Sequence, residues 1–243
     1  MYDQLPYNQE NDKRYDLIEF VENPEPRCPY IVLVDSSASM EGEPINELYN
    51  GLKIFKQELL NNELAAKRVE LAVISFNSNA SVLTDGFVNP MEFNPMPIKT
   101  DGATRMCDAI KLAVSIAEAR KEQYKEAGIG YYRPWIVLIT DGNPTDEYGN
   151  CLEYDSKEFL EVANMIKTGN DDKSFSFFAI GVGEYVDMEA LTRICPANRP
   201  PKKLAGLKFY ELFKWLSNSA KSRSNSAVGE KCPISPTDGW SED

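Results

Sequence analysis

The sequence contains no histidine among its 243 residues. Ser-His-Asp and Cys-His enzymes need an imidazole as general base, so this absence excludes both families of nucleophilic catalyst. It also excludes the zinc and non-haem iron sites that are built on histidine. Any chemistry in this chain must therefore use carboxylates, hydroxyls, lysines or a hard metal ion.

Cysteines are few, and they are scattered at positions 28, 107, 151, 195 and 232. Their number is odd and no two form a Cys-x-x-Cys pair, which argues against a disulfide framework and a structural zinc site. No apolar run approaches the roughly 18 residues of a membrane span. The polar N-terminus, residues 1–16, has no signal-peptide core. We therefore expect a cytoplasmic protein that does not contact a membrane.

Positive charge is also in short supply, because 26 Lys and Arg residues face 38 Asp and Glu residues. The formal net charge of −12 repels a phosphate backbone, so we expect no nucleic-acid partner. The hydrophobic fraction of 42% is too high for a disordered chain and allows a sizeable core.

Apolar strand patterns alternate with amphipathic helix patterns along the chain. Buried strands are predicted at residues 30–34, 69–76, 135–140 and 174–183, and helices at 41–62, 106–117, 159–166, 187–194 and 208–220. A further strand at 81–88 follows a link too short for a crossover helix, so it should be an antiparallel edge strand. This order predicts an α/β fold: a doubly wound, mainly parallel Rossmann-like sheet with helices on both faces.

The domain organisation predicted from these patterns is simple. Residues 1–27 are expected to form an irregular leader that ends in a proline-rich segment. Residues 28–221 carry all the strand and helix patterns and should form one domain, since no linker or repeat interrupts them. Residues 222–243 are expected to be a polar C-terminal tail.

Three polar segments stand at the ends of predicted strands or at the start of a helix. They are residues 35–39 (DSSAS), 101–104 (DGAT) and 140–142 (TDG). Each alone is explained by helix capping or by a turn. Ligands of doubly wound folds, however, bind at the carboxyl ends of strands, at the switch point. The coincidence of the three segments there favours a shared site.

Carboxylate and hydroxyl oxygens are the donors that these segments offer. Asp35 and Asp141 supply carboxylates, whereas Ser37, Ser39 and Thr104 supply hydroxyls. Oxygen-only donor sets suit a hard divalent cation, Mg²⁺ or Mn²⁺. If the carboxylates do not fully offset its charge, the ion has a place for an anionic oxygen from another molecule.

In order, Asp35, Ser37 and Ser39 (D-x-S-x-S), Thr104 (G-x-T) and Asp141 (T-D-G) resemble the metal-ion-dependent adhesion site of von Willebrand factor type A (VWA) domains. The resemblance covers nearly the whole chain. It implies that both serines coordinate the ion directly and that Thr104 binds it directly or through water. It also implies that the two aspartates anchor the site, often through bound waters.

Two positions depart from the family pattern. Ala38 stands where D-x-S-G-S has glycine, and Asp101 replaces a glycine common before G-x-T. Four further segments resemble the bacterial tellurite-resistance TerY-like subgroup of the family: ENPEPRCP, SSASMEGEPI, YYRPWIVLITDGNPTDE and GLKFYELFKWLS. That resemblance implies a stress-response setting, in which such domains are often encoded near protein kinases and phosphatases.

The leading functional hypothesis is a metal-dependent adaptor, not an enzyme. A protein partner would supply an Asp or Glu that completes the shell of the cation, which is a directional, charge-assisted contact. The alternative is a magnesium-dependent phosphotransferase or phosphatase with Asp35 as nucleophile. Such enzymes typically place a second aspartate two residues on, where this chain has Ser37. A third hypothesis is a purely structural domain whose site is vestigial.

Overall fold

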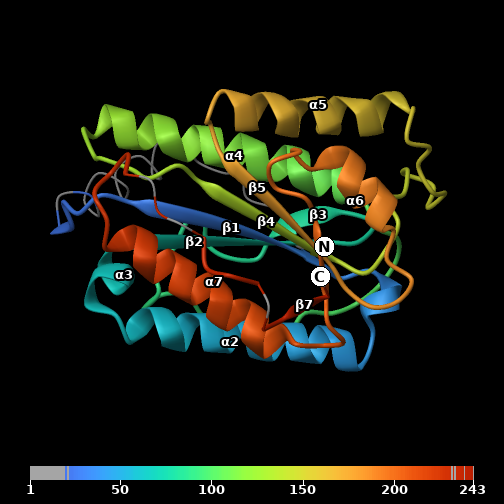
Figure 1. The fold of residues 1–243 in the computed structure, drawn as a ribbon, viewed down its shortest axis with the longest axis horizontal. Coiled ribbons are helices and arrows are strands. Elements are labelled where there is room, and N and C mark those ends of the chain that lie inside the picture. Colours follow the sequence, from blue (N-terminus) through green and yellow to red (C-terminus); the bar gives the residue numbers. More distant parts are fainter. Residues whose placement is uncertain (1–19, 21, 231, 233, 238, 243) are drawn as a thin grey trace, which may run out of the picture.

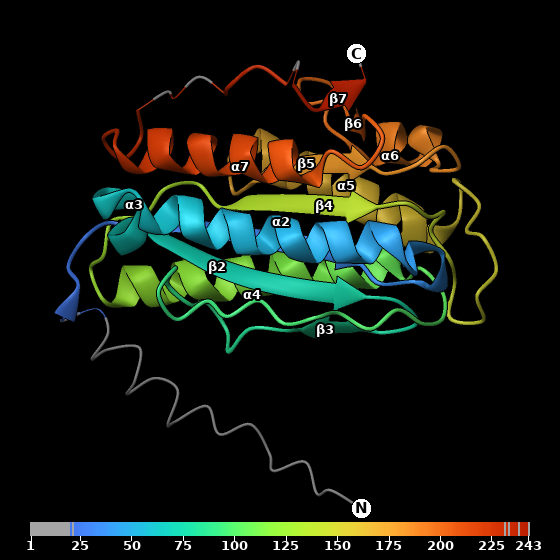
Figure 2. The same ribbon diagram turned by 90° about the horizontal axis from the view of Figure 1, so that it is seen from below.

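The computed structural model describes residues 20, 22–230, 232, 234–237 and 239–242. Within these residues, seven strands form one sheet in the order β3-β2-β1-β4-β5-β6-β7. Helices cover both faces of this sheet (Figures 1 and 2). The bounds of the strands are β1 Cys28–Asp35, β2 Val69–Phe76, β3 Ala80–Val82, β4 Trp135–Thr140, β5 Ser176–Gly181, β6 Lys202–Leu204 and β7 Ser241–Glu242.

The helices divide into two layers, as Figure 1 shows. The short 3-10 helix η1 (Ala38–Met40) leads into the first layer, which holds α2 (Glu43–Leu60), α3 (Glu63–Arg68) and α7 (Phe209–Ser224). The second layer holds α4 (Met106–Glu126), α5 (Lys157–Asp171) and α6 (Met188–Ile194). Among the described residues, no helix has the length and apolarity needed to span a membrane.

Side-chain alternation along β1 builds both cores. Tyr30 and Val32 face the α2–α7 layer, whereas Ile31 and Leu33 face the α4–α6 layer. All eight residues of β1 are buried, as expected for a parallel strand that is covered on both faces.

The chain reverses its direction of winding at β1. Strand β1 pairs in parallel with β2 on one side and with β4 on the other. The switch point of the sheet therefore lies between the ends of β1 and β4, next to Asp35 and Thr140. This arrangement confirms the predicted fold class.

The predicted antiparallel edge strand is correct in kind but shorter than expected. Strand β3 pairs antiparallel with β2 over three residues only, instead of residues 81–88. A turn at Gly86, with φ +63°, interrupts the ladder before Val88 bridges back to Leu71. Residues that carry a side chain rarely adopt this backbone angle, so the glycine allows the turn that ends the strand.

Two features of the structure are not among the predicted elements: helix α3, and a second antiparallel edge in which β7 pairs with β6. These elements have six, two and three residues, too few for a periodic pattern. The boundary expected at residue 222 falls inside α7, which ends at Ser224. Beyond it, Trp240 is 2% exposed and its ring lies 5.1 Å from that of Trp215. Most of the predicted leader, residues 1–27, lies outside the described residues.

The close approach of α2 to α7 gives the first prediction. A Cβ at Gly51 of α2 would lie 2.6 Å from Cε2 of Phe213 on α7, a ring that is fully buried. Gly51→Ala should therefore lower the free energy of unfolding by about 1–2 kcal/mol, because overpacking outweighs the helix-propensity gain. Thermal unfolding should show a midpoint about 3–6 °C lower.

The matched control for Gly51 is Gly130→Ala, where the added Cβ would meet its nearest atom at an ordinary 3.6 Å. This variant should keep the wild-type midpoint. A Gly51→Ala protein as stable as the wild type would show that the α2–α7 contact is not tightly packed.

Candidate metal centre

Asp35 is the last residue of the central strand β1, and its carboxylate is fully buried. Its Oδ1 accepts a hydrogen bond from the backbone N–H of Ser37 at 2.8 Å. Its Oδ2 accepts a hydrogen bond from the hydroxyl of Thr140, the last residue of β4. The two strand ends at the switch point are thus joined by one carboxylate.

The serine turn follows directly. Ser37 is the N-cap of η1, and this tight turn brings Ser37 Oγ to 3.0 Å from Ser39 Oγ. Ser39 Oγ donates to Asp141 Oδ1 at 2.8 Å. The turn after β1 is therefore connected to the loop after β4 through side chains that the sequence marked as donors.

The loop that carries Thr104 is hydrogen-bonded to the serine turn. The N–H of Asp101 donates to Ser36 O at 3.0 Å, and the N–H of Ala38 donates to Gly102 O at 3.2 Å. These two bonds bring the third segment alongside the first, although about 65 residues separate them in the sequence.

Thr104 itself is held from the other side by Thr145. The N–H of Thr104 donates to Thr145 Oγ1 at 3.0 Å, and the N–H of Thr145 donates to Thr104 O at 2.9 Å. A Cβ at Gly142 would lie 2.8 Å from Thr104 Oγ1 and 3.6 Å from Asp35 Oδ2. Both oxygens approach the same point, and glycine at 142 leaves that point free.

The structure thus brings all five candidate side chains to one end of the sheet. Asp35, Ser37 and Thr104 are buried at the base of the site, whereas Asp141 is half-buried and Ser39 is exposed. The donors form a cup with a buried base and an accessible rim.

The two departures from the family pattern fit this geometry. Ala38 lies in η1, and among the described residues Lys173 is the one non-glycine residue with positive φ, so the methyl group at 38 causes no backbone strain. Asp101 is exposed and its Oδ1 accepts from the N–H of Gly102 at 2.8 Å, which makes it part of the turn before Thr104.

The electrostatics of the site follow from burial. Burial raises the pKa of Asp35 to about 6, although hydrogen bonds from Ser37 and Thr140 act in the opposite direction and the charge of Asp141 adds to the rise. Partial burial also raises the pKa of Asp141, against the hydrogen bond from Ser39. In the described part of the chain, neither carboxylate has an ion pair with Lys or Arg.

A divalent cation fits this donor set. Two carboxylates that lack a cationic partner are favoured in their ionised form by a positive charge nearby. The described residues contain no group of three or more His, Cys, Asp or Glu that could hold a metal ion. Hydroxyl groups would therefore have to supply the remaining ligands, as suits Mg²⁺ or Mn²⁺ but not zinc.

Thr140 and Gly142 are predicted from the sequence to lie within a turn, but the sequence gives neither of them a role. The motif T-D-G contains both, so a signal was present. Thr145 was missed entirely, because its role depends on a contact with Thr104 that spans 41 residues and leaves no local pattern.

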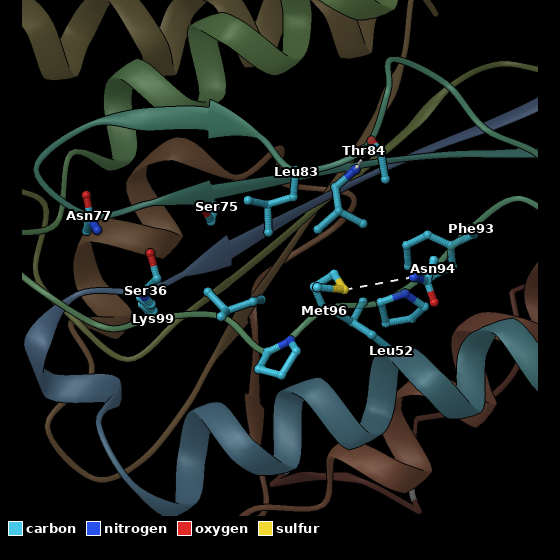
Figure 3. Close-up of a pocket in the computed structure, with 14 residues that line it drawn as sticks. Ser36, Leu52, Ser75, Asn77, Leu83, Thr84, Phe93, Asn94, Met96 and Lys99 are labelled. Carbon is cyan, nitrogen blue, oxygen red and sulfur yellow. Dashed lines mark hydrogen bonds between the residues drawn. The ribbon is translucent and has the colours of Figure 1, made fainter. Parts of the chain in front are cut away.

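A cavity of about 260 Å³ lies beside the site but does not contain it. It is lined by residues of α2 and β2, by the residues that follow β3 and by the proline-rich segment 93–99 that leads to Asp101. Figure 3 shows Ser36 and Asn77 at one end of the cavity and Phe93 and Asn94 toward the other. None of the five donors lines it, so it is distinct from the candidate metal centre.

An open, mostly parallel α/β sheet with acidic and hydroxyl side chains at its switch point defines the class: a Rossmann-like domain with a candidate ion site. The family model of the von Willebrand factor type A domain matches residues 31–209, well over half of the chain. The chain therefore belongs to the von Willebrand factor type A domain family, many of whose members are interaction or adhesion modules. No curated protein matches the chain.

Solved structures show the same fold at low sequence identity. The von Willebrand factor type A protein from Catenulispora acidiphila has a TM-score of 0.58 at 15% identity, and covers 81% of this chain and 43% of its own. The pilus adhesin SpaC from Lactobacillus rhamnosus GG gives 0.62 at 13%, covering 82% and 30%. The vWF domain of the pili tip protein Mfa5 from Porphyromonas gingivalis gives 0.61 at 10%, covering 85% and 99%. The chain spans less than half of the first two proteins.

The raised pKa of Asp35 predicts a pH-dependent stability for the chelated protein. The folded state keeps the Asp35 proton up to about pH 6, whereas the unfolded chain releases it near 3.8. Between these values the folded state binds more protons, so the free energy of unfolding falls as pH rises and stays lower above pH 6. Asp35→Asn should not show this fall in the free energy of unfolding, because asparagine does not titrate. In EDTA, its stability relative to wild type should improve by on the order of 2–3 kcal/mol from pH 4 to pH 8.

Urea unfolding at both pH values measures this difference, and the effects of titrating groups that do not interact with Asp35 cancel in the comparison. The control is Asp101→Asn, which makes the same chemical change at a carboxylate that is exposed rather than buried. A stability difference for Asp35→Asn that is independent of pH would contradict the burial argument.

Proposed function

We propose that this chain is a metal-dependent protein-interaction domain and not an enzyme. Asp35, Ser37, Ser39, Thr104 and Asp141 would hold Mg²⁺ or Mn²⁺, and a protein partner would supply an Asp or Glu to the same ion. The observation that carries the proposal is the convergence of these oxygens from three separate loops around two carboxylates without a cationic partner.

The position of each residue indicates whether it would coordinate the ion directly or orient the other ligands. Ser37 and Ser39, whose Oγ atoms lie 3.0 Å apart, are placed to coordinate the ion directly. Asp35 is fixed by Ser37 N–H and Thr140 and would orient the serine turn rather than move. When bound, the ion supplies a positive, oxygen-seeking charge near the exposed rim at Ser39, within reach of a partner's carboxylate.

The phosphotransferase alternative gains no support from the geometry. A nucleophilic carboxylate must reach the phosphorus atom, but Asp35 is 0% exposed and both of its oxygens accept hydrogen bonds. The position two residues on is occupied by Ser37, which lacks the carboxylate used for metal binding or acid–base chemistry in such enzymes.

A cytoplasmic, bacterial stress-response setting such as tellurite resistance is part of the proposal. The sequence segments that resemble the TerY-like subgroup support it, and the odd number and wide spacing of the five cysteines agree with a reducing compartment. A partner connected with a protein kinase or phosphatase system fits the same setting.

The serine pair predicts the metal affinity of point variants. Ser37→Ala and Ser39→Ala should each weaken Mg²⁺ binding by at least about tenfold, since even outer-shell changes have effects of that size. Isothermal titration of Mg²⁺ into the chelator-treated and dialysed protein measures the affinity, and circular dichroism checks the fold.

The matched control is the adjacent serine. Ser36 Oγ donates to Phe76 O at 3.1 Å and is outside the donor set, so Ser36→Ala should keep the wild-type Mg²⁺ affinity. If all three serine variants bind Mg²⁺ equally, the proposed donor set is wrong.

The absence of enzymatic activity is a separate prediction. With Mg²⁺ present, wild type and Asp35→Asn should hydrolyse an aryl phosphate ester at the same background rate, because Asp35 cannot reach the substrate. A phosphate-release assay measures both rates. Turnover by the wild type that disappears in Asp35→Asn would revive the enzymatic hypothesis.

A further inference from the structure

Two tyrosines are the most exposed large hydrophobic side chains among the described residues. Tyr185 is 92% exposed and Tyr148 is 82% exposed. Tyr148 lies in the β4–α5 loop and Tyr185 in the β5–α6 loop. Large aromatic side chains held in solvent on strand-end loops are well suited to contact a partner.

Both loops are attached to the candidate metal centre. Tyr148 lies in a small hairpin closed by the bridge between Thr145 and Cys151, and Thr145 holds Thr104. The β5–α6 loop begins beside the end of β4, where the N–H of Val182 donates to Thr140 O at 2.8 Å. In Figures 1 and 2 both loops lie at the end of the sheet toward which β4 points.

A second contact ties the two loops to each other. The hydroxyl of Tyr154, in the β4–α5 loop, donates to Asp187 Oδ2, at the start of α6, at 2.8 Å. The two exposed tyrosines therefore stand on loops that are connected to each other and to the candidate metal centre.

The loops around the centre, called the acidic rim below, carry mostly negative charge. Residues 36–42, 100–105, 141–156 and 182–187 contain nine acidic residues and one basic residue, Arg105. Arg105 already forms ion pairs with Asp108 and Glu158. Several rim carboxylates are exposed and have no ion pair within the described residues: Glu41, Asp101, Glu147 and Glu184.

A divalent cation would offset the charges of Asp35 and Asp141 but not those of the rim. An incoming carboxylate would be repelled by these exposed acids unless positive charge arrived with it. Arginine is the residue best suited to supply that charge here, because its planar guanidinium also stacks on aromatic rings.

We propose that the partner presents its metal-coordinating Asp or Glu within an arginine-rich segment, whose guanidinium groups pack on Tyr148 and Tyr185. This inference rests on the proposed function and adds the chemistry of the partner segment to it. The tyrosines provide the packing surface, and the acidic rim selects against partners whose key acid lies among other acids.

Capped synthetic peptides test the inference on the full chain by isothermal titration in Mg²⁺. The probes have the sequences RRDRR, QQDQQ and RRNRR. The arginine peptide RRDRR should bind at least about tenfold more tightly than QQDQQ, because each rim charge adds a modest attraction. RRNRR should bind weakly, since its asparagine cannot replace the carboxylate at the ion, and EDTA should reduce RRDRR binding to the same level.

The double variant Tyr148→Ala/Tyr185→Ala should lose about threefold or more in affinity for RRDRR, as expected for exposed cation–π contacts. Its Mg²⁺ affinity should be unchanged. The matched control is Tyr210→Ala, at a tyrosine that is 48% exposed on α7, and it should bind RRDRR like the wild type.

The outcomes separate this inference from the proposed function. If the protein binds Mg²⁺ but RRDRR binds no better than QQDQQ, or neither peptide binds, the basic-segment inference is overturned and the metal site stands. Equal binding of RRDRR and RRNRR, or binding unaffected by EDTA, would reveal charge attraction alone and would also overturn it. If no Mg²⁺ binds, the proposed function itself fails.

Discussion

The buried carboxylate of Asp35 is the constraint on which the site depends. It ends the central strand, accepts from the N–H of Ser37 and from the hydroxyl of Thr140, and so joins the serine turn to the end of β4. Burial makes its charge unfavourable and raises its pKa to about 6. A carboxylate is expected in such a position where a function needs it, and a cation at the site would favour its ionised form.

The sheet topology explains why three distant loops meet there. Parallel pairing places Val34 opposite Ile139, so the residues that follow leave the sheet at the same edge. The loop with Thr104 is then held between them by backbone hydrogen bonds to the serine turn and to Thr145. The base of the resulting cup is buried and its rim is exposed, an arrangement that suits a carboxylate arriving on another protein better than an enclosed small substrate.

Much of the fold could be predicted from the sequence because its strands are apolar runs with clear ends. The bounds of β2 and β4 match the predicted ranges, whereas β6 and β7 are too short and too polar to give a signal. The candidate donors could be found from their motifs, since each follows a predicted strand or precedes a helix. The role of Thr145 could not be predicted, because it depends on a long-range hydrogen bond to Thr104. That a methyl group fits at Ala38 could not be predicted either, because this depends on the backbone angle there.

The central claim is that one divalent ion is held by oxygens from all three loops. A crystal structure of the protein soaked in Mn²⁺, with the metal located by its anomalous scattering, tests it most directly. We expect one strong peak within about 2.0–2.3 Å of the Oγ atoms of Ser37 and Ser39, near the usual coordination distance of a hard six-coordinate cation. A peak elsewhere, or none at a saturating concentration, would contradict the account.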